Sequence, residues 1–204
     1  MNNFNAIAPI YDQLKSLVFW GRLDDAKRAH LHQIKAGSRV LVLGGGSGQI
    51  LSYLDDLEMS LAVDFVELSE KMMLIAKGRS FSNIHVNYVL EDVLTLDIEA
   101  SYDVVIANFI FDLFEIDNLR FLLKKVSNCL SPNGVLLVAD FQINKRWHAW
   151  FSQLMHGFFH LVASLESRQL KEINSELKMA GFHRTSSSDF YKGFIFSSVF
   201  SFNI

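Results

Sequence analysis

Apolar runs and amphipathic stretches alternate along the first two thirds of the chain. The runs are rich in Val, Leu and Ile, which is typical of strands buried on both faces, and the stretches between them carry apolar residues at helical spacing. Strands are predicted at 39–43, 61–66, 84–90, 103–108 and 135–140, with helices at about 48–57, 69–79 and 117–130. Repeated strand–helix units of this kind predict a parallel sheet with helices on both faces.

The rhythm changes after residue 141. An aromatic segment (145–165) and a polar helix (about 166–180) are followed by two strands near 182–188 and 192–203. Four phenylalanines of the last strand recur at period two and share one face: Phe194, Phe196, Phe200 and Phe202. We expect this stripe to lie in the core and the strand to form an antiparallel hairpin at one sheet edge. The fold class is therefore α/β: a Rossmann-like, doubly wound, mostly parallel seven-stranded sheet with an antiparallel C-terminal strand.

The composition is that of a globular protein. A chain of 204 residues with 50% hydrophobic content can bury a substantial core, and one domain is expected. We divide it into an N-terminal helical cover (1–36), a ligand-binding core (37–141) and a lid segment with closing elements (142–204). The single cysteine, Cys129, is expected to be a buried structural thiol.

Charge and hydropathy limit the partners. The formal net charge of -3 lacks the basic footprint of a protein that binds nucleic acid, so a small molecule is the expected partner. No apolar run is long enough to span a bilayer as a helix, and the N-terminus does not follow the signal-peptide pattern. A cytoplasmic location is expected.

Four glycines in five residues follow the first predicted strand. The run VLVLGGGSGQIL passes from a strand through Gly44, Gly45, Gly46 and Gly48 into a helix. Glycine reaches positive φ and lets backbone N–H groups touch a ligand, and a helix N-terminus offers further donors. Glycine turns also serve packing alone, so the loop is read together with the other strand ends.

Polar residues follow the next predicted strands at the same edge of the sheet. In an open α/β sheet, ligands bind beyond the carboxyl ends of the strands. Glu67 follows the second strand and could accept hydrogen bonds from two ribose hydroxyls, or it could instead be an acid at a helix start capped by Ser69. Asp92 follows the third strand and could accept from an exocyclic amine such as adenine N6, with Val93 and Met72 as apolar neighbours.

These segments together resemble a class I S-adenosylmethionine-dependent methyltransferase over residues 4–141. VLVLGGGSGQIL resembles the first motif of that family, VDFVELSEKMMLIAK its acidic ribose-binding segment, LEDVLTL its adenine-binding segment and LSPNGVLLVADF its late loop-and-strand motif. The opening FNAIAPIYDQL resembles the N-terminal cover of members related to quinone-biosynthesis methyltransferases. The resemblance implies S-adenosylmethionine as cofactor, bound by Gly44, Gly46, Glu67, Asp92 and Val93, with Tyr11 over its methionine end. The other expected binding residues are Gly45, Leu68, Met72 and Asn108.

One position departs from the family pattern. Many members carry an acidic residue two positions before the first motif glycine, and this chain has Val42 there. The acid that would help to position the amino-acid part of the cofactor is therefore missing. Binding of that part is expected to depend more on Tyr11, Asn108 and backbone groups.

Other functions stay open. GGGSGQ with VELSE also resembles the nucleoside-binding half of aminopropyltransferases, which use decarboxylated cofactor but carry an acidic polyamine site that this chain lacks after Asn108. A cofactor-binding regulator without catalysis is a third reading. A nicotinamide enzyme is disfavoured because GxGxxG would need glycine at Gln49 or Leu51, and a P-loop because the loop lacks GK[ST].

The acceptor is expected to be small and apolar or aromatic. Phe109, Phe111, Phe114 and the aromatic segment 147–162 would flank the methyl donor, although the segment could instead form a homodimer interface, a membrane-surface helix or core. No catalytic triad is visible, and His148 and Asp112 are only guesses for a general base. His156 and His160 share a helical face without a third ligand nearby, so no metal is expected.

Overall fold

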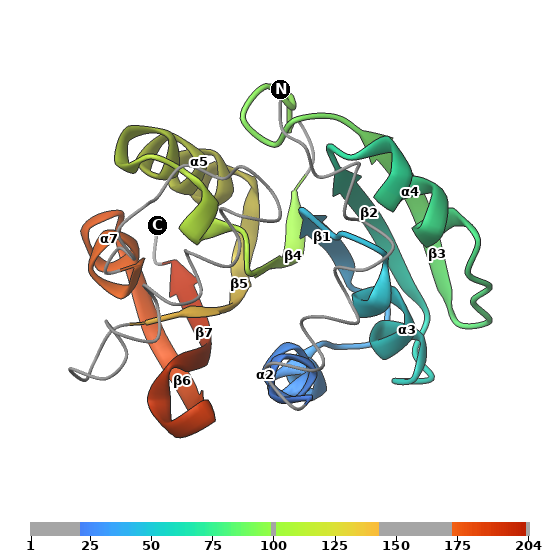
Figure 1. Cartoon of the computed structure of the whole chain (residues 1–204), viewed down its shortest axis with the longest axis horizontal. Helices are drawn as coiled ribbons and strands as arrows, with labels where there is room; N and C mark the ends of the chain where they lie inside the picture. Colours follow the sequence, from blue (N-terminus) through green and yellow to red (C-terminus); the bar gives the residue numbers. More distant parts are fainter. Residues whose placement is uncertain (1–20, 99–100, 143–172, 203–204) are drawn as a thin grey trace, which may run out of the picture.

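A computed structural model describes residues 21–98, 101–142 and 173–202 (Figure 1). Its helices are α2 (Arg22–Arg28), α3 (Gln49–Asp55), α4 (Glu70–Lys77), α5 (Ile116–Cys129) and α7 (Ile173–Met179), with short 3-10 helices η1 (Leu31–Gln33), η2 (Phe111–Leu113) and η3 (Tyr191–Gly193). Its strands are β1 (Arg39–Leu43), β2 (Leu61–Glu67), β3 (Ile84–Leu90), β4 (Tyr102–Asn108), β5 (Leu130–Phe141), β6 (Phe182–Phe190) and β7 (Ile195–Phe202).

Within the described residues, seven strands form one sheet in the order β3-β2-β1-β4-β5-β7-β6. Strands β1 to β5 pair in parallel, and β7 runs antiparallel to both β5 and β6. The expected seven-stranded, mostly parallel sheet with an antiparallel C-terminal strand is confirmed. The parallel part places the carboxyl ends of five strands at one edge, where a ligand site is expected.

Helices cover the two faces of the sheet, as the doubly wound pattern predicts. Helices α3 and α4 pack on one face, where Val40 and Val42 of β1 are buried with Phe65 of β2. Helices α5 and α7 pack on the other face, where Leu41 and Leu43 of β1 are buried. Figure 1 shows the two pairs of helices on opposite sides of the strands. Alternate residues of the same strand thus enter different cores, which explains the continuous apolar runs.

The phenylalanine stripe lies in the core, as expected. Phe196 and Phe200 are at most 2% exposed and pack on the α5 and α7 face, while Val199 lies on the opposite face. The expected antiparallel hairpin at one sheet edge is confirmed: β7 pairs antiparallel with β6, with β7 next to β5 and β6 outermost. An interior strand must be covered on both faces, which is why serine-containing β7 is still almost fully buried.

Residues 131–134, between the predicted helix and the predicted strand, are part of β5. Leu130 pairs with Tyr102 and Val135 with Val104, with a shift in register between the two pairs. Asn133 takes a left-handed conformation with φ of 68° inside this irregularity. The four residues therefore form a bulge in the strand and do not separate it from α5.

Two further expectations can be compared with the structure. Cys129 is buried at the end of α5, and burial raises the pKa of its thiol to about 11, so the expected structural thiol is confirmed. Across residues 21–98, 101–142 and 173–202, no helix combines the length and apolar character needed to cross a membrane.

Candidate functional site

The strand register brings the sequence-predicted residues to one edge. Leu43, the last residue of β1, lies opposite Val66 of β2 and Ala107 of β4. The next residue on each strand is Gly44, Glu67 or Asn108, so these three groups stand side by side. Leu90 ends β3 opposite Glu67, which places the segment containing Asp92 at the same edge. Topology alone therefore assembles the candidate site.

Three of the four loop glycines are required by packing within the protein. A Cβ atom at each position would collide with a neighbouring side chain: Gly44 with Ile110, Gly45 with Phe65 and Gly48 with Ala76. The structural interpretation of the glycine run is thus correct for these positions. They allow the loop to lie tightly against β2, η2 and α4.

Gly46 is different from the other three. A Cβ atom there would meet no described atom within 4 Å, and the residue has a φ of 61°. The space next to its backbone is open, and its main-chain N–H points to the carboxylate of Glu67. Gly46 is therefore the loop glycine whose surroundings allow close approach by a ligand.

Glu67 connects the glycine loop to the start of α4. Its Oε2 accepts from Gly46 N at 2.8 Å, and its Oε1 accepts from Ser69 N at 2.7 Å. Ser69 itself caps α4, because its Oγ accepts from Met72 N at 3.3 Å. The helix-start role belongs to Ser69, and Glu67 is a half-buried carboxylate whose two oxygens can each accept a further hydrogen bond.

An apolar surface extends beside Glu67. Leu68 is 57% exposed and Leu90, at the end of the adjacent strand, is 52% exposed. Large aliphatic side chains are seldom left open without a reason when they cluster beside polar groups. Met72, expected as an apolar neighbour of Asp92, is instead buried on α4, whereas Leu68 is exposed.

Asp92 organises the turn that follows β3. Its Oδ1 accepts from Leu94 N at 2.9 Å, and its carbonyl accepts from Thr95 N and Leu96 N. Val93 is 6% exposed and joins the α5 core. The second carboxylate oxygen of Asp92, Oδ2, has no partner within the described part of the chain and can accept from a ligand.

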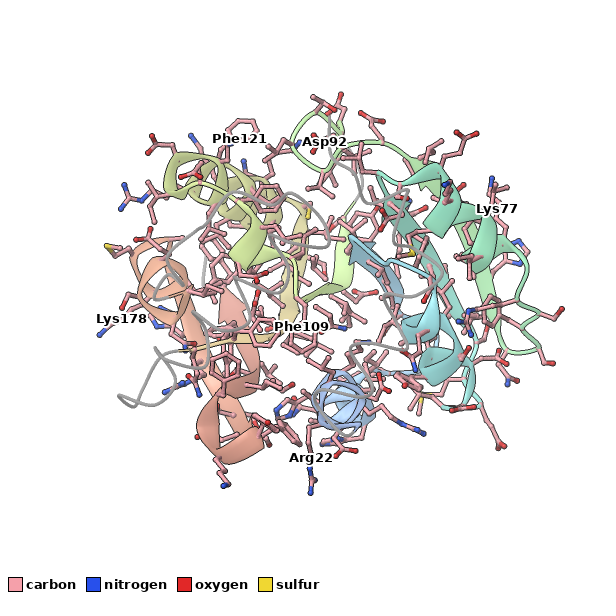
Figure 2. The ribbon with its side chains drawn as sticks, in the orientation of Figure 1. Arg22, Lys77, Asp92, Phe109, Phe121 and Lys178 are labelled. Atoms are coloured by element: carbon pink, nitrogen blue, oxygen red, sulfur yellow. The ribbon has the colours of Figure 1, made fainter. Side chains whose placement is uncertain are left out.

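Asn108 and Phe109 form the end of β4. The Asn108 side-chain nitrogen is buried and donates to no described group. Phe109 has a φ of 55°, an unfavourable value for a bulky residue, and its N–H donates to Ala139 O at 2.7 Å. Figure 2 shows Phe109 near the centre of the molecule, at the junction of the two halves of the sheet. An unsatisfied donor beside a strained residue is typical of a functional site.

Aromatic rings surround this end of β4. The centroid of Phe109 lies 5.1 Å from that of Phe141, which lies 5.3 Å from that of Phe194. These rings pack with Leu23 and Ala26 of α2. Phe109 was expected near the methyl donor, whereas the sequence did not indicate that Phe141 and Phe194 would join it.

Asp140 is a site residue that sequence reasoning missed. It is fully buried near the end of β5, and its carboxylate accepts from Phe111 N at 3.1 Å and Phe141 N at 2.8 Å. Burial, followed by the charge of Asp112, raises the pKa of Asp140 well above the usual carboxyl value. A single charged residue within an otherwise apolar strand was the signal that could have identified it. It fixes η2 against β5 beside the candidate site.

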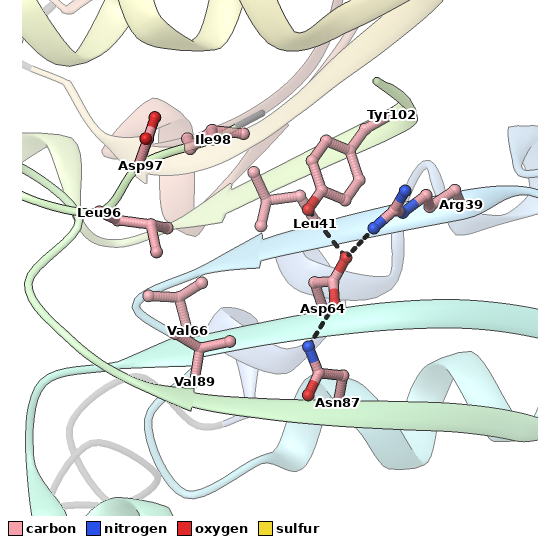
Figure 3. Close-up of a pocket in the computed structure, with 10 residues that line it drawn as sticks. All are labelled: Arg39, Leu41, Asp64, Val66, Asn87, Val89, Leu96, Asp97, Ile98 and Tyr102. Atoms are coloured by element: carbon pink, nitrogen blue, oxygen red, sulfur yellow. Dashed lines mark hydrogen bonds and ion pairs between the residues drawn. The ribbon is translucent and has the colours of Figure 1, made fainter. Parts of the chain in front are cut away.

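A cavity of about 420 Å³ lies on the sheet face below the strand ends (Figure 3). At one end, Asp64 accepts from Arg39 Nη2 at 3.0 Å, Tyr102 Oη at 2.8 Å and Asn87 Nδ2 at 2.7 Å. Aliphatic side chains line the other end: Leu41, Val66, Val89, Leu96 and Ile98. None of the glycine-loop residues borders it. The cavity is therefore separate from the residues gathered at the strand ends.

Several expected residues lie outside the described part of the chain. They are Tyr11, the segment 147–162, His148, His156 and His160. Val42, at the position of the missing acid, is 2% exposed and packs in the α3 and α4 core. Among the described residues, no group of three or more His, Cys, Asp and Glu side chains could hold a metal ion.

Comparisons with known proteins agree with this geometry. A family model described as a methyltransferase domain matches residues 41–136. Malonyl-[acyl-carrier protein] O-methyltransferase of Bacillus cereus is 33% identical over 141 residues, which cover 69% of this chain and 48% of that protein. The chain thus spans about half the length of this and similar malonyl-carrier relatives.

Two further proteins match over most of their length. Demethylmenaquinone methyltransferase of Tropheryma whipplei is 27% identical over 206 residues, covering 90% of this chain and 83% of that protein. A chain from the complex of the Haloferax volcanii Trm112 methyltransferase activator with a methyltransferase superposes with a TM-score of 0.75 at 16% identity, covering 98% and 97% of the two chains. Motifs, sheet order and family match agree, and the chain belongs to the class I S-adenosylmethionine-dependent methyltransferases.

Proposed function

We propose that this chain binds S-adenosylmethionine across the ends of β1, β2, β3 and β4 and transfers its methyl group to a small acceptor. The observation that carries the proposal is the pairing of the Glu67 carboxylate with Gly46 N–H beside open space. The carboxylate would accept from the ribose hydroxyls, and the open backbone at Gly46 leaves room for the nucleoside.

The adenine ring would lie between the exposed side chain of Leu68 and the turn at Asp92. Leu68 offers an apolar surface to one face of the base, and Asp92 Oδ2 can accept from its exocyclic amine. The buried amide nitrogen of Asn108 would donate to the amino-acid end of the cofactor. This donor would partly replace the acid missing at position 42.

When bound, S-adenosylmethionine supplies an electrophilic methyl group on a positively charged sulfur. An acceptor nucleophile would attack the methyl carbon in line with the carbon–sulfur bond; as the new bond forms, that bond would break and S-adenosylhomocysteine would leave with its electron pair. Positioning and exclusion of water can supply most of the rate enhancement, so a general base on the protein is not required when the acceptor is already anionic.

The aromatic cluster favours an apolar or aromatic acceptor. Phe109, Phe141 and Phe194 stand at the ends of β4 and β5 or at the start of β7, next to the proposed position of the methyl group. Aromatic faces also attract a sulfonium, by about 0.5–2 kcal/mol. The two curated relatives are named for a malonyl carrier protein and for demethylmenaquinone. The ring cluster fits the second kind of acceptor better, because a carboxylate acceptor calls for Arg or Lys partners.

Calorimetry with S-adenosylmethionine and S-adenosylhomocysteine tests the binding step. We expect both ligands to bind to the wild type and to bind more weakly to Glu67→Ala, which serves as the comparison variant. Binding of neither at millimolar concentration, together with binding of a nicotinamide cofactor, contradicts the proposal. Binding of decarboxylated S-adenosylmethionine in clear preference favours the aminopropyltransferase alternative.

Release of S-adenosylhomocysteine tests the transfer step. The acceptors to compare are quinols, phenols, fatty acids, malonyl thioesters, transfer RNA and histone-like peptides. We expect turnover with quinols or phenols. Turnover confined to RNA or peptides rejects the proposed acceptor class, and cofactor binding without turnover of any acceptor favours a regulatory protein.

A further inference from the structure

Lys125 of α5 holds the turn that follows β3. Its Nζ donates to three main-chain carbonyls: Val93 O at 3.1 Å, Leu94 O at 3.0 Å and Leu96 O. The side chain is half-buried, and Nζ lies 5.5 Å from the ring centroid of Phe121. The three ammonium hydrogens are thus all directed into one turn. Figure 2 shows Phe121 on α5 and Asp92 on that turn at the same end of the molecule.

The turn has two sets of backbone groups that point in different directions. The N–H groups of Leu94, Thr95 and Leu96 donate to the side chain or carbonyl of Asp92. The carbonyls of Val93, Leu94 and Leu96 converge on Lys125. Three converging carbonyl dipoles repel one another, and a cation between them removes that repulsion. Lys125 therefore stabilises the same backbone conformation that orients the Asp92 carboxylate.

We infer that Lys125 is the positioning residue for base recognition, and that it sets the preference of this site for adenine over a base without an exocyclic amine. The inference rests on the proposed binding of S-adenosylmethionine. Asp92 Oδ1 accepts from Leu94 N within the turn, so the direction of the other carboxylate oxygen, Oδ2, depends on the conformation of the turn. Without the cation, water would replace the ammonium and the turn would sample several conformations, each aiming Oδ2 differently.

The test compares two ligands that differ in the exocyclic group of the base and in the protonation of the adjacent ring nitrogen N1. S-adenosylhomocysteine carries an exocyclic amine, and S-inosylhomocysteine carries a carbonyl oxygen in its place. Calorimetry on the full chain gives the ratio of their dissociation constants for the wild type, Lys125→Met and Lys124→Met. Methionine keeps most of the aliphatic stem of lysine, and Lys124 is the exposed neighbour on the same helix.

We expect Lys125→Met to weaken S-adenosylhomocysteine binding by about tenfold, the equivalent of one lost hydrogen bond. Binding of S-inosylhomocysteine should change by less than about twofold, so the ratio moves toward one. Lys124→Met should leave both constants unchanged. A merely structural role would weaken both ligands equally, and an unchanged ratio in Lys125→Met therefore overturns the inference.

Hydrogen exchange separates this inference from the proposed function. In Lys125→Met the amides of Leu94, Thr95 and Leu96 should exchange faster than in the wild type, while those of β1 stay protected. Unchanged exchange in the turn overturns the role of Lys125 even where ligands bind. A wild type that binds neither ligand instead rejects the proposed function. Lys125→Gln provides the same comparison should the methionine variant not fold.

Discussion

The side-chain carboxylate of Glu67 accepts a hydrogen bond from the main-chain N–H of Gly46 at 2.8 Å. This contact joins the last residue of β2 to the loop after β1. The other oxygen of the Glu67 carboxylate accepts a hydrogen bond from Ser69 N at 2.7 Å, so the carboxylate has a defined orientation before any ligand is present. A group fixed in this way loses little conformational entropy on binding.

Replacement of Glu67 should weaken cofactor binding directly. Glu67→Ala removes the proposed bonds to the ribose, and we expect a loss of about 1.5–3 kcal/mol in binding free energy. Calorimetry with S-adenosylhomocysteine measures it. Glu70→Ala, an exposed acid in the first turn of α4, is the control and should bind normally. Equal affinity of Glu67→Ala and wild type would leave Glu67 with a structural role only.

Two glycines of the same loop should respond in opposite ways to alanine. Gly46→Ala places a methyl group in the open space and adds the strain of a positive φ, about 1 kcal/mol, so it should abolish binding with a modest fall in melting temperature. Gly45→Ala drives a methyl group into the Phe65 ring and should mainly destabilise the fold. Thermal unfolding and calorimetry on both variants distinguish these effects. Similar losses of stability would show that Gly46 also serves packing.

The ionised carboxylate of Asp64 should stabilise the fold at neutral pH and lose this effect in acid. Burial raises its pKa, but the hydrogen bonds from Asn87, Tyr102 and Arg39 outweigh that effect, and the net pKa is lowered. A carboxyl group whose pKa is lowered by folding stabilises the fold at pH values above its usual pKa of about 4. This contribution disappears as the pH falls through the lowered pKa.

Asp64→Asn should therefore reduce the free energy of unfolding by about 1–2 kcal/mol at pH 7. Urea titrations at pH 7 and pH 3 should show a smaller difference from wild type at the lower pH. Asp97→Asn, an exposed carboxylate bordering the same cavity, is the control. A difference that grows in acid would contradict the assignment.

Asp140 should produce the opposite pH dependence. Its raised pKa means that the folded protein holds the proton more tightly than the unfolded chain does. Its contribution to stability is full below the usual carboxyl pKa and is lost as the pH rises toward the raised value. The slope from this one group is at most about 1.4 kcal/mol per pH unit. Asp140→Asn should remove that slope at pH values above about 4, whatever the effect of the substitution on stability at any single pH. If the free energy of unfolding of Asp140→Asn and of the wild type depended on pH in the same way, the interpretation would be refuted.

Much of the sheet could be predicted because its strands are buried on both faces. The boundaries of β1 and β3 agree with the expected 39–43 and 84–90, since continuous apolar runs mark strands with cores on both sides. The position of Glu67 followed from the same reasoning, because the parallel strands end at one edge. The antiparallel hairpin at the sheet edge was also predicted. Its order, with β7 next to β5 and β6 outermost, could not be, because pairing between strands far apart in the chain leaves no local pattern.

The features of the candidate site that the sequence did not reveal depend on long-range contacts. Lys125 is one of several charged positions on an amphipathic helix, and only the fold shows that it reaches Leu94 and its neighbours. Phe109 gives no hint in the sequence of its positive φ, which its hydrogen bond to Ala139 helps to impose. Asp140 could be seen as a polar residue near a strand end, but its complete burial depends on η2.

The insertion of β7 between β5 and β6 has a consequence for biosynthesis. Phe141 at the end of β5 pairs with Ile195, so β5 keeps an unpaired edge until the ribosome has added the residues of β7. Strand β6 emerges earlier and also has to wait, because β7 is its neighbour in the sheet. Nascent chains would therefore expose two unpaired strand edges late in translation, a stage at which edge-to-edge association with other chains competes with folding.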